Sequence, residues 1–353
     1  RPVRESQYRY YTDESDWGST GDLERVDIGE YDPALDRWSL VRQTYYRYYK
    51  AGDPEGFAHG LKYVVSPEGY ARMRGLGLDP ATADDTLLRS YSSHYFKYHG
   101  DRRVFEEWIR GGTELFRYEY LENPAAPAVD AWNLWAVRTT ETLPDGNRRV
   151  VYTNAAGMVI LIKEVETATG REWFTYRQYS EAGLPTVAAK PSAIESVVEP
   201  VEGLSYTLSV TLKANAGLVY ENVYYTEDNP AVGAVVNYQK ELLTRKGSAG
   251  SNVKLRETSF ASQTVESVTI HPFASKTTFL REGVPSTTSY ARAYFGEDGQ
   301  PSGMAPAAVV SFSVNSVVND IVIEQSETLY DEAGQVIASA QFQRFHDTTG
   351  TGP

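Results

Sequence analysis

The sequence of 353 residues contains no cysteine, which excludes disulfide bonds, thiol catalysis and zinc sites built from thiolates. No apolar run approaches the roughly 20 residues that a membrane-spanning helix requires, so no insertion into a membrane is expected. The sequence also lacks a basic stripe, and its formal net charge is −13. An acidic surface of this kind repels polyanions, so nucleic-acid partners are not expected either.

Motifs that carry catalysis are missing as well. None of the five histidines stands in a His-x-x-x-His or His-Glu-x-x-His arrangement. There is no Gly-x-Ser-x-Gly elbow, no phosphate-cradling loop and no Gly-x-Gly-x-x-Gly motif after a strand. We therefore predict no catalytic residue and expect that the chain is not an enzyme. His94 and His99 form either a metal or acid–base pair or an ordinary pair at a strand edge.

Tyrosine is the residue that the sequence has in excess, with 26 copies against 12 of Phe and 6 of Trp. A tyrosine ring suits a pleated sheet surface that is apolar at the ring and wet at the hydroxyl. From Tyr95 onward the apolar pattern has a period of two, with a clean alternation over Leu204–Leu212. Turn signals separate these short segments, which predicts a mainly β fold built from an antiparallel sheet.

A small helical insert is predicted near residues 66–92. Ser66-Pro67 has the form of an N-cap followed by Pro at the first helical position, and the helix is expected to end near Arg74. Asp79-Pro80 repeats this start signal for a second helix through Tyr91. We divide the chain at composition shifts into residues 1–94, with Tyr-rich strands, an acidic loop and the insert, then hairpins (95–195), an antiparallel β domain (196–284), and hairpins with a tail (285–353).

Several strands end in one pattern, in which a Tyr is followed by polar residues, a small residue, a Gly and an apolar strand. The polar residue is expected to cap the turn, and the Gly to adopt a positive φ. Stacked hairpins of this kind form a sheet that grows sideways. The structural residues of these copies are Tyr98, Tyr152 with Gly157, Tyr179 with Gly183, and Tyr330 with Asp331 and Gly334.

The pattern resembles the YD repeats of Rhs and teneurin-type proteins, whose signature is Tyr-Asp-x-x-Gly-Arg before an apolar strand. Tyr330-Asp331 keeps the pair but has Gln335 where Arg is usual, and Tyr31-Asp32 has Asp36 where the Gly belongs. The resemblance implies a fragment of a large bacterial surface protein whose hairpins form a partial shell or a barrel-like coil. Its implied role is structural and non-catalytic, as scaffold, filament, adhesion surface or shell, outside the cell or on its surface.

Three further expectations accompany this interpretation. Trp132 and Trp135 would bind glycan if their rings were exposed in a carbohydrate-binding or carbohydrate-degrading β protein, whereas core packing is the alternative. Asp13, Asp16 and Asp22 belong to the densest carboxylate cluster and are the candidate calcium ligands, with a solvated loop as the alternative; no other cofactor is expected. Exposed sheet edges predict self-association, with copies of the chain or with the remainder of a parent polypeptide. A cocoon fragment of a polymorphic toxin is the remaining alternative.

Overall fold

A computed structural model describes residues 4–32, 36–126, 131–265, 268–281, 284–294, 306–315, 321–330 and 336–343. The chain divides into two compact units. Unit 1 comprises Arg1–Glu122, Val137–Tyr152 and Ile162–Trp173. Unit 2 comprises Asn123–Ala136, Thr153–Leu161 and Phe174–Pro353. Strands make up 54% of the chain and helices 8%, so the predicted mainly β fold is confirmed.

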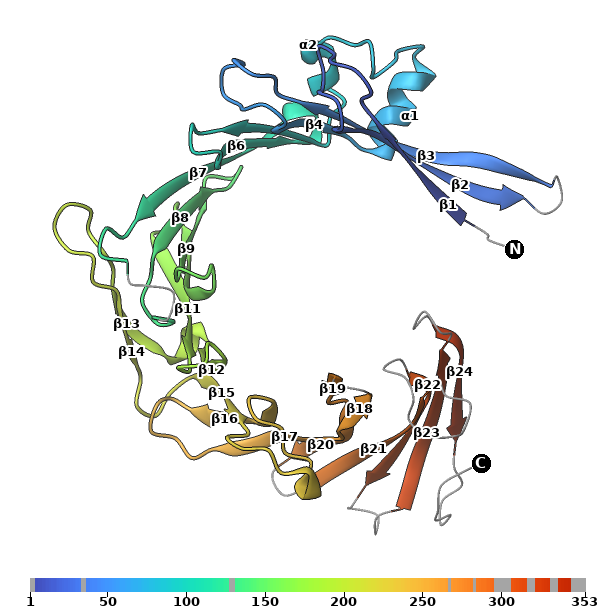
Figure 1. Ribbon diagram of the computed structural model, residues 1–353. Coiled ribbons are helices and arrows are strands. Elements are labelled where there is room, and N and C mark those ends of the chain that lie inside the picture. The colour runs from blue at the N-terminus through green and yellow to red at the C-terminus, as the bar shows by residue number, and fades with distance from the viewer. Residues whose placement is uncertain are drawn as a thin grey trace. The chain divides into compact units, whose positions relative to one another are not determined.

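The strands of unit 1 pair antiparallel in chain order (Figure 1). They are β1 (Arg4–Tyr10), β2 (Leu23–Asp32), β3 (Arg37–Tyr48), β4 (Leu61–Val65), β5 (His94–Tyr98), β6 (Val104–Ile109), β7 (Glu114–Glu122) and β8 (Val137–Thr142), with the short helix η1 (Arg110–Gly112) before β7. Three further strands contain residues of both units: β9 (Arg148–Thr153), β10 (Val159–Glu166) and β11 (Arg171–Tyr179).

Unit 2 has a second antiparallel ladder, in which each strand pairs with the next one named. From β11 it continues through β12 (Pro185–Ala189), β15 (Leu218–Tyr224), β16 (Gln239–Lys246), β17 (Val253–Phe260), β20 (Phe273–Arg281), β21 (Val284–Tyr294), β22 (Pro306–Asn315), β23 (Ile321–Tyr330) and β24 (Val336–Gln343). Two hairpins stand outside this ladder, β13 (Ile194–Val198) with β14 (Ser209–Leu212) and β18 (Gln263–Val265) with β19 (Val268–Ile270); the short helices are η2 (Pro191–Ala193) and η3 (Pro230–Val232).

The pairing in unit 2 crosses two of the boundaries that we placed from composition. β12 pairs with β15 across the boundary at 195/196, and β20 pairs with β21 across the one at 284/285. The block 196–284 therefore continues the ladder on both sides of it. The strand predicted over Leu204–Leu212 is shorter in the structure, because β14 begins at Ser209 and Leu204 stands 85% exposed in a turn.

The helical insert lies in unit 1, as expected. Helix α1 (Pro67–Gly75) begins where the sequence predicts, and the Ser66 hydroxyl accepts a hydrogen bond from Gly69 N. The predicted start of the second helix at Asp79-Pro80 is wrong. Those residues form a turn in which Asp79 accepts from Ala81 N, and α2 (Asp85–Arg89) begins later, capped by Asp84. No helix in the described part of the chain has the length and apolar character needed to cross a lipid bilayer.

The two units have different interiors. Unit 1 holds a cluster, here called the tyrosine core, formed by Tyr45, Tyr49, Tyr63, Val65, Tyr70, Met73, Ala83, Leu88 and Tyr95. In unit 2 a smaller group, here called the alanine cluster, consists of Ala189, Ala193, Ile194 and Val219. The helical insert supplies Tyr70, Met73 and Leu88, so the tyrosine core lies between the sheet and the insert.

Candidate functional site

The clearest repeat turn follows Tyr179. Ser180 N donates to Leu184 O over 2.8 Å, and Gly183 N donates to Ser180 O over 3.0 Å. The Ser180 hydroxyl also accepts from Leu184 N, and Gly183 has a φ of 75°. The register of β11 and β12 shifts between Gln178 and Tyr179, as it does when a left-handed residue forms a bulge after a short hairpin loop. Ser180 thus caps the turn and Gly183 closes it, the arrangement that the pattern predicts.

The turn between β9 and β10 has the same bonds. Asn154 N donates to Met158 O and Gly157 N donates to Asn154 O, each over 2.9 Å, and Gly157 has a φ of 77°. The cap is stronger here, because the Asn154 side-chain oxygen accepts from the N–H groups of both Ala156 and Met158. Asn154 is only 3% exposed, and its amide nitrogen donates to Trp132 O. The Asn154 side chain thus makes three hydrogen bonds to backbone groups.

The two copies differ in the position of the tyrosine. Tyr179 stands four residues before Gly183, as the repeat signature requires, whereas Tyr152 stands five residues before Gly157. The position that corresponds to Tyr179 is taken by Thr153. Tyr152 is fully buried nonetheless, so its role is that of a core residue next to the turn.

Two more turns share the backbone pattern. His99 N donates to Arg103 O and Arg102 N donates to His99 O, so the copy after Tyr98 closes on Arg102, whose φ is 70°. The other turn joins β8 to β9, where Leu143 N donates to Asn147 O and Gly146 has a φ of 82°. It has no tyrosine at the signature position, so the tyrosine pattern does not reveal it as a repeat copy. The dipeptide Asp145-Gly146 nevertheless predicts a hairpin there.

The literal Tyr-Asp pairs lie at the ends of described strands. Tyr31 pairs with Trp38 and Asp32 with Arg37 in the β2–β3 ladder. Asp36 has a φ of 48°, so it adopts the conformation that the missing glycine would favour, and its carboxylate accepts from the Tyr31 hydroxyl. Tyr330 ends β23; Asp331 and Gly334 lie outside the described residues.

The predicted tryptophan pair does not form an exposed platform for sugar. Trp135 is 2% exposed, stacks on Tyr206 and donates from its indole to Tyr206 O over 2.8 Å. Trp132 donates to Glu181 O, and its ring lies about 3.0 Å from where a side chain on Gly183 would begin. Of the two alternatives, packing describes this pair: the buried Trp135 ring stacks on Tyr206, and the half-buried Trp132 ring lies over the turn at Gly183.

The acidic loop does not gather its carboxylates around one point. Asp22 accepts from Ser19 N over 2.8 Å and lies 2.9 Å from His59 Nδ1. Asp13 accepts from the hydroxyl of Thr12, and Asp16 is exposed. Over the described ranges, no group of three or more His, Asp or Glu side chains is arranged to hold a metal ion. The calcium site therefore stays a prediction.

A buried arginine in unit 1 is the polar centre that the sequence reading missed. Arg47 is 0% exposed, and its Nη1 lies 2.7 Å from an Asp85 oxygen. Its Nη2 donates to Pro80 O and Ala83 O, and the guanidinium carbon lies 3.6 Å from the centre of the Trp17 ring. Arg47 thus ties β3 to the helical insert and to the acidic loop. The alternation of side chains along a strand could have revealed this burial, because it places Arg47 on the same face as Tyr45 and Tyr49.

Buried tyrosine hydroxyls surround this centre. The hydroxyl oxygens of Tyr11 and Tyr45 lie 3.0 Å apart, and Tyr49 donates to Phe96 O over 2.7 Å. Burial, more than any neighbouring charge, raises the pKa of Tyr11, Tyr45 and Tyr49 well above the ordinary value. These phenols remain protonated at neutral pH and act as donors that hold the fold together.

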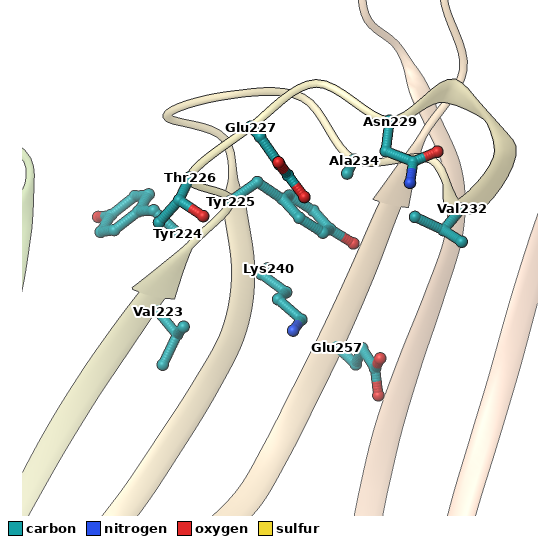
Figure 2. A pocket seen from close by; sticks show the side chains of 10 residues that line it. All are labelled: Val223, Tyr224, Tyr225, Thr226, Glu227, Asn229, Val232, Ala234, Lys240 and Glu257. Carbon is teal, nitrogen blue, oxygen red and sulfur yellow. The ribbon is translucent and has the colours of Figure 1, made fainter.

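Unit 2 contains an open pocket of about 530 Å³ at the ends of β15, β16 and β17. Figure 2 shows Tyr225, Lys240 and Glu257 along its wall. The Tyr225 hydroxyl donates to Thr258 O, and burial followed by the charge of Glu257 raises the pKa of Tyr225. Glu257 itself lies 3.0 Å from Lys254 Nζ. The pocket offers hydrogen-bonding groups and two carboxylates, Glu227 and Glu257, of which Glu257 is paired with a lysine.

No family model matches the chain, and no curated protein matches it. Among solved structures, the chain is similar to a chain in the structure titled "Crystal Structure of TcdB2-TccC3-Cdc42", with 11% sequence identity and a TM-score of 0.25. The alignment covers 92% of this chain and 19% of that chain. The chain thus spans about a fifth of the length of the protein it matches, and a likeness at this level identifies neither a family nor a function.

Proposed function

We propose that this chain is a non-catalytic structural segment of a large extracellular YD-repeat surface protein, in which its sheets form part of a wall or scaffold. The observation that carries the proposal is the succession of antiparallel strands within each unit, from β1 to β8 and from β11 to β24. Each strand covers the edge of its neighbour, and the turns that begin at His99, Leu143, Asn154 and Ser180 share one set of backbone bonds. Such a ladder grows by repetition, which suits an extended wall.

The use of polar groups supports a structural role. His94 Nδ1 lies 2.7 Å from Glu107 Oε1, and His59 Nδ1 lies 2.9 Å from Asp22 Oδ1, so each of these imidazoles has a carboxylate partner. Burial raises the pKa values of Tyr11 and Tyr45, which moves these phenols further from the range in which acid–base catalysts work at neutral pH. In the described part of the chain these groups hold turns, strands and the insert together.

Location outside the cell and the absence of catalysis are parts of this proposal. The partners that it implies are further strands, supplied by copies of this chain or by the remainder of a parent polypeptide, because a free strand edge pairs readily with another strand.

Antibody labelling of source cells tests the proposal. Antibodies raised against the purified chain should label intact cells as strongly as permeabilised cells, and a protease added outside should remove the label. An antibody to a cytoplasmic protein is the matched control, which must label only after permeabilisation. If the chain is labelled only after permeabilisation, the surface role is excluded.

A further inference from the structure

Strand β1 lies beside β2 at one end of the sheet of unit 1 (Figure 1). It pairs with β2 in a register that runs from Arg4 opposite Glu30 to Tyr10 opposite Leu23, and within the described residues no residue-by-residue pairing occupies its other edge. Its tyrosines stand in solvent, with Tyr8 60% and Tyr10 53% exposed. A free edge presents unpaired backbone N–H and C=O groups, and these groups favour the addition of another strand.

The charges of β1 are complementary to themselves when the strand is turned end for end. In an antiparallel pair of two β1 strands centred on Gln7, Glu5 stands opposite Arg9 of the second copy, and Arg9 opposite Glu5. These three residues share one face of the strand because side chains alternate. Opposite charges that face each other across two strands stabilise the pair.

The side chains on the other face of β1 are also complementary in this register. Arg4 stands opposite Tyr10 of the second copy, and Ser6 stands opposite Tyr8. A guanidinium beside a tyrosine ring gains a favourable cation–π contact. Pairing would also remove part of the exposed rings of Tyr8 and Tyr10 from water, which is favourable for any apolar surface.

The present contacts of these side chains leave room for such a pair. Arg9 Nε lies 3.2 Å from an Asp27 oxygen, but the Arg9 side chain is still 57% exposed. A guanidinium has five N–H donors, so Arg9 can remain bound to Asp27 and donate to a second carboxylate as well. Glu5 accepts a hydrogen bond from Gln7 of the same strand, and this exposed pair can rearrange toward a second strand.

We propose that β1 pairs antiparallel with β1 of a second copy about a two-fold axis at Gln7, so that two sheets join at this edge. The inference deepens the proposed structural role and rests on it. The partner is a second copy, because the order of charges along Arg4-Glu5-Ser6-Gln7-Tyr8-Arg9-Tyr10 is complementary to the same strand in reverse.

Two charge reversals in β1 test the register. Sedimentation velocity over a concentration series should show a reversible dimer of the wild-type chain. Glu5→Arg places two arginines opposite each other at both pairs, and Arg9→Glu does the same with two glutamates. Because each cross-strand charge pair changes from attraction to repulsion, each variant alone should dimerise about tenfold more weakly or worse.

A mixture of the two variants is the decisive arm. One copy then carries arginine at both positions and the other carries glutamate at both, so both charge pairs are restored and the mixture should associate at least as well as the wild type. Glu119→Arg, an equal charge change at an exposed position of β7 in the same unit, is the control and should leave dimerisation unchanged. Circular dichroism of each variant verifies the fold, and the mixing arm also shows that each variant keeps a competent edge.

Three results would overturn the pairing: a monomeric wild-type chain at the highest soluble concentration, a mixture that associates no better than its components, or an equal effect of Glu119→Arg. A monomer together with surface labelling of intact cells would refute the strand pair while leaving the proposed surface role standing.

Discussion

The tyrosine core of unit 1 and the alanine cluster of unit 2 are both buried, but they differ in depth and in the size of their side chains. The tyrosine core is deep, because helices α1 and α2 lie over the sheet, and it encloses polar hydroxyls together with Arg47. The alanine cluster is thin, because small side chains let backbone approach backbone. A side chain on Gly217 would begin 2.2 Å from Ala193 N, a distance that no real contact allows.

The difference shows what each type of interior depends on. A deep core tolerates polar groups when most of their polar atoms are bonded, and it loses stability when a bond is removed without replacement. A thin core contains few polar side chains and depends on shape, so it fails when atoms are added. The four predictions that follow test this contrast, from the largest expected effect to the smallest.

Alkaline pH should unfold unit 1 before unit 2. Burial raises the pKa of Tyr48 and of Tyr98 to about 12, whereas tyrosines in an unfolded chain ionise near 10. The folded state therefore holds protons that the unfolded state loses, and stability that is complete below pH 10 declines as the pH rises from about 10 to about 12. Hydrogen exchange followed by peptide mapping at stepped pH measures the order in which the two units open. If the β15–β17 peptides of unit 2 open first, the predicted order is wrong.

Removing the buried cation should damage the tyrosine core most among single substitutions. Arg47→Met removes the fully buried one of the two cations that bind Asp85 and takes a donor from two backbone carbonyls, so the free energy of unfolding should fall by about 3–5 kcal/mol. Lys62→Met is the control: Lys62 also binds Asp85, but it is partly exposed, and its loss should cost about 1 kcal/mol. Urea denaturation of both variants gives the comparison, and equal losses would refute the central role of Arg47.

Adding one methyl group should damage the alanine cluster. Gly217→Ala places a side chain into the Ala193 backbone at a φ of 79°, so we expect a loss of about 3 kcal/mol. Gly203→Ala has a similar φ of 74° but meets no atom within 4 Å, and it should cost only about 1–2 kcal/mol. Thermal unfolding of the two variants separates crowding from backbone strain. If both variants lose the same stability, crowding is not the cause.

The smallest effect is expected at the turns. Asn154→Ala removes the acceptor for two backbone N–H groups in a buried site, which should cost about 1–3 kcal/mol. Ser180→Ala removes one longer bond in a half-buried turn and should cost about 0.5–1 kcal/mol. Denaturant midpoints of the two variants rank the caps. A larger loss for Ser180→Ala would show that burial of Asn154 does not decide the strength of its cap.

Local patterns predicted the parts of this fold that local forces control. Ser66-Pro67 predicted the start of α1, because an N-cap acts within one turn of helix. The spacing of Gly183 predicted a closed hairpin, because a positive φ is a property of one residue. Asp79-Pro80 carries the same local signal as Ser66-Pro67, yet it forms a turn.

Two features that the local patterns left open depend on contacts that form only in the folded chain. Trp135 is buried because Tyr206, 71 positions later, receives its ring and its N–H. Asp36 adopts a positive φ at a position where the signature has glycine, with the Tyr31 hydroxyl donating to its carboxylate. Neither outcome could be predicted from neighbours in the chain, because the deciding contact is made only when the strands are in register.

The sequence by itself determined that the chain is mainly β, that its strands pair through short hairpins and that a helix begins at Pro67, since period, turn residues and caps act over a few residues. Only the tertiary structure decided that Arg47 is buried and that Gly217 touches Ala193. Burial depends on what the neighbouring strands and the insert cover, and that is fixed by packing among segments far apart in the chain.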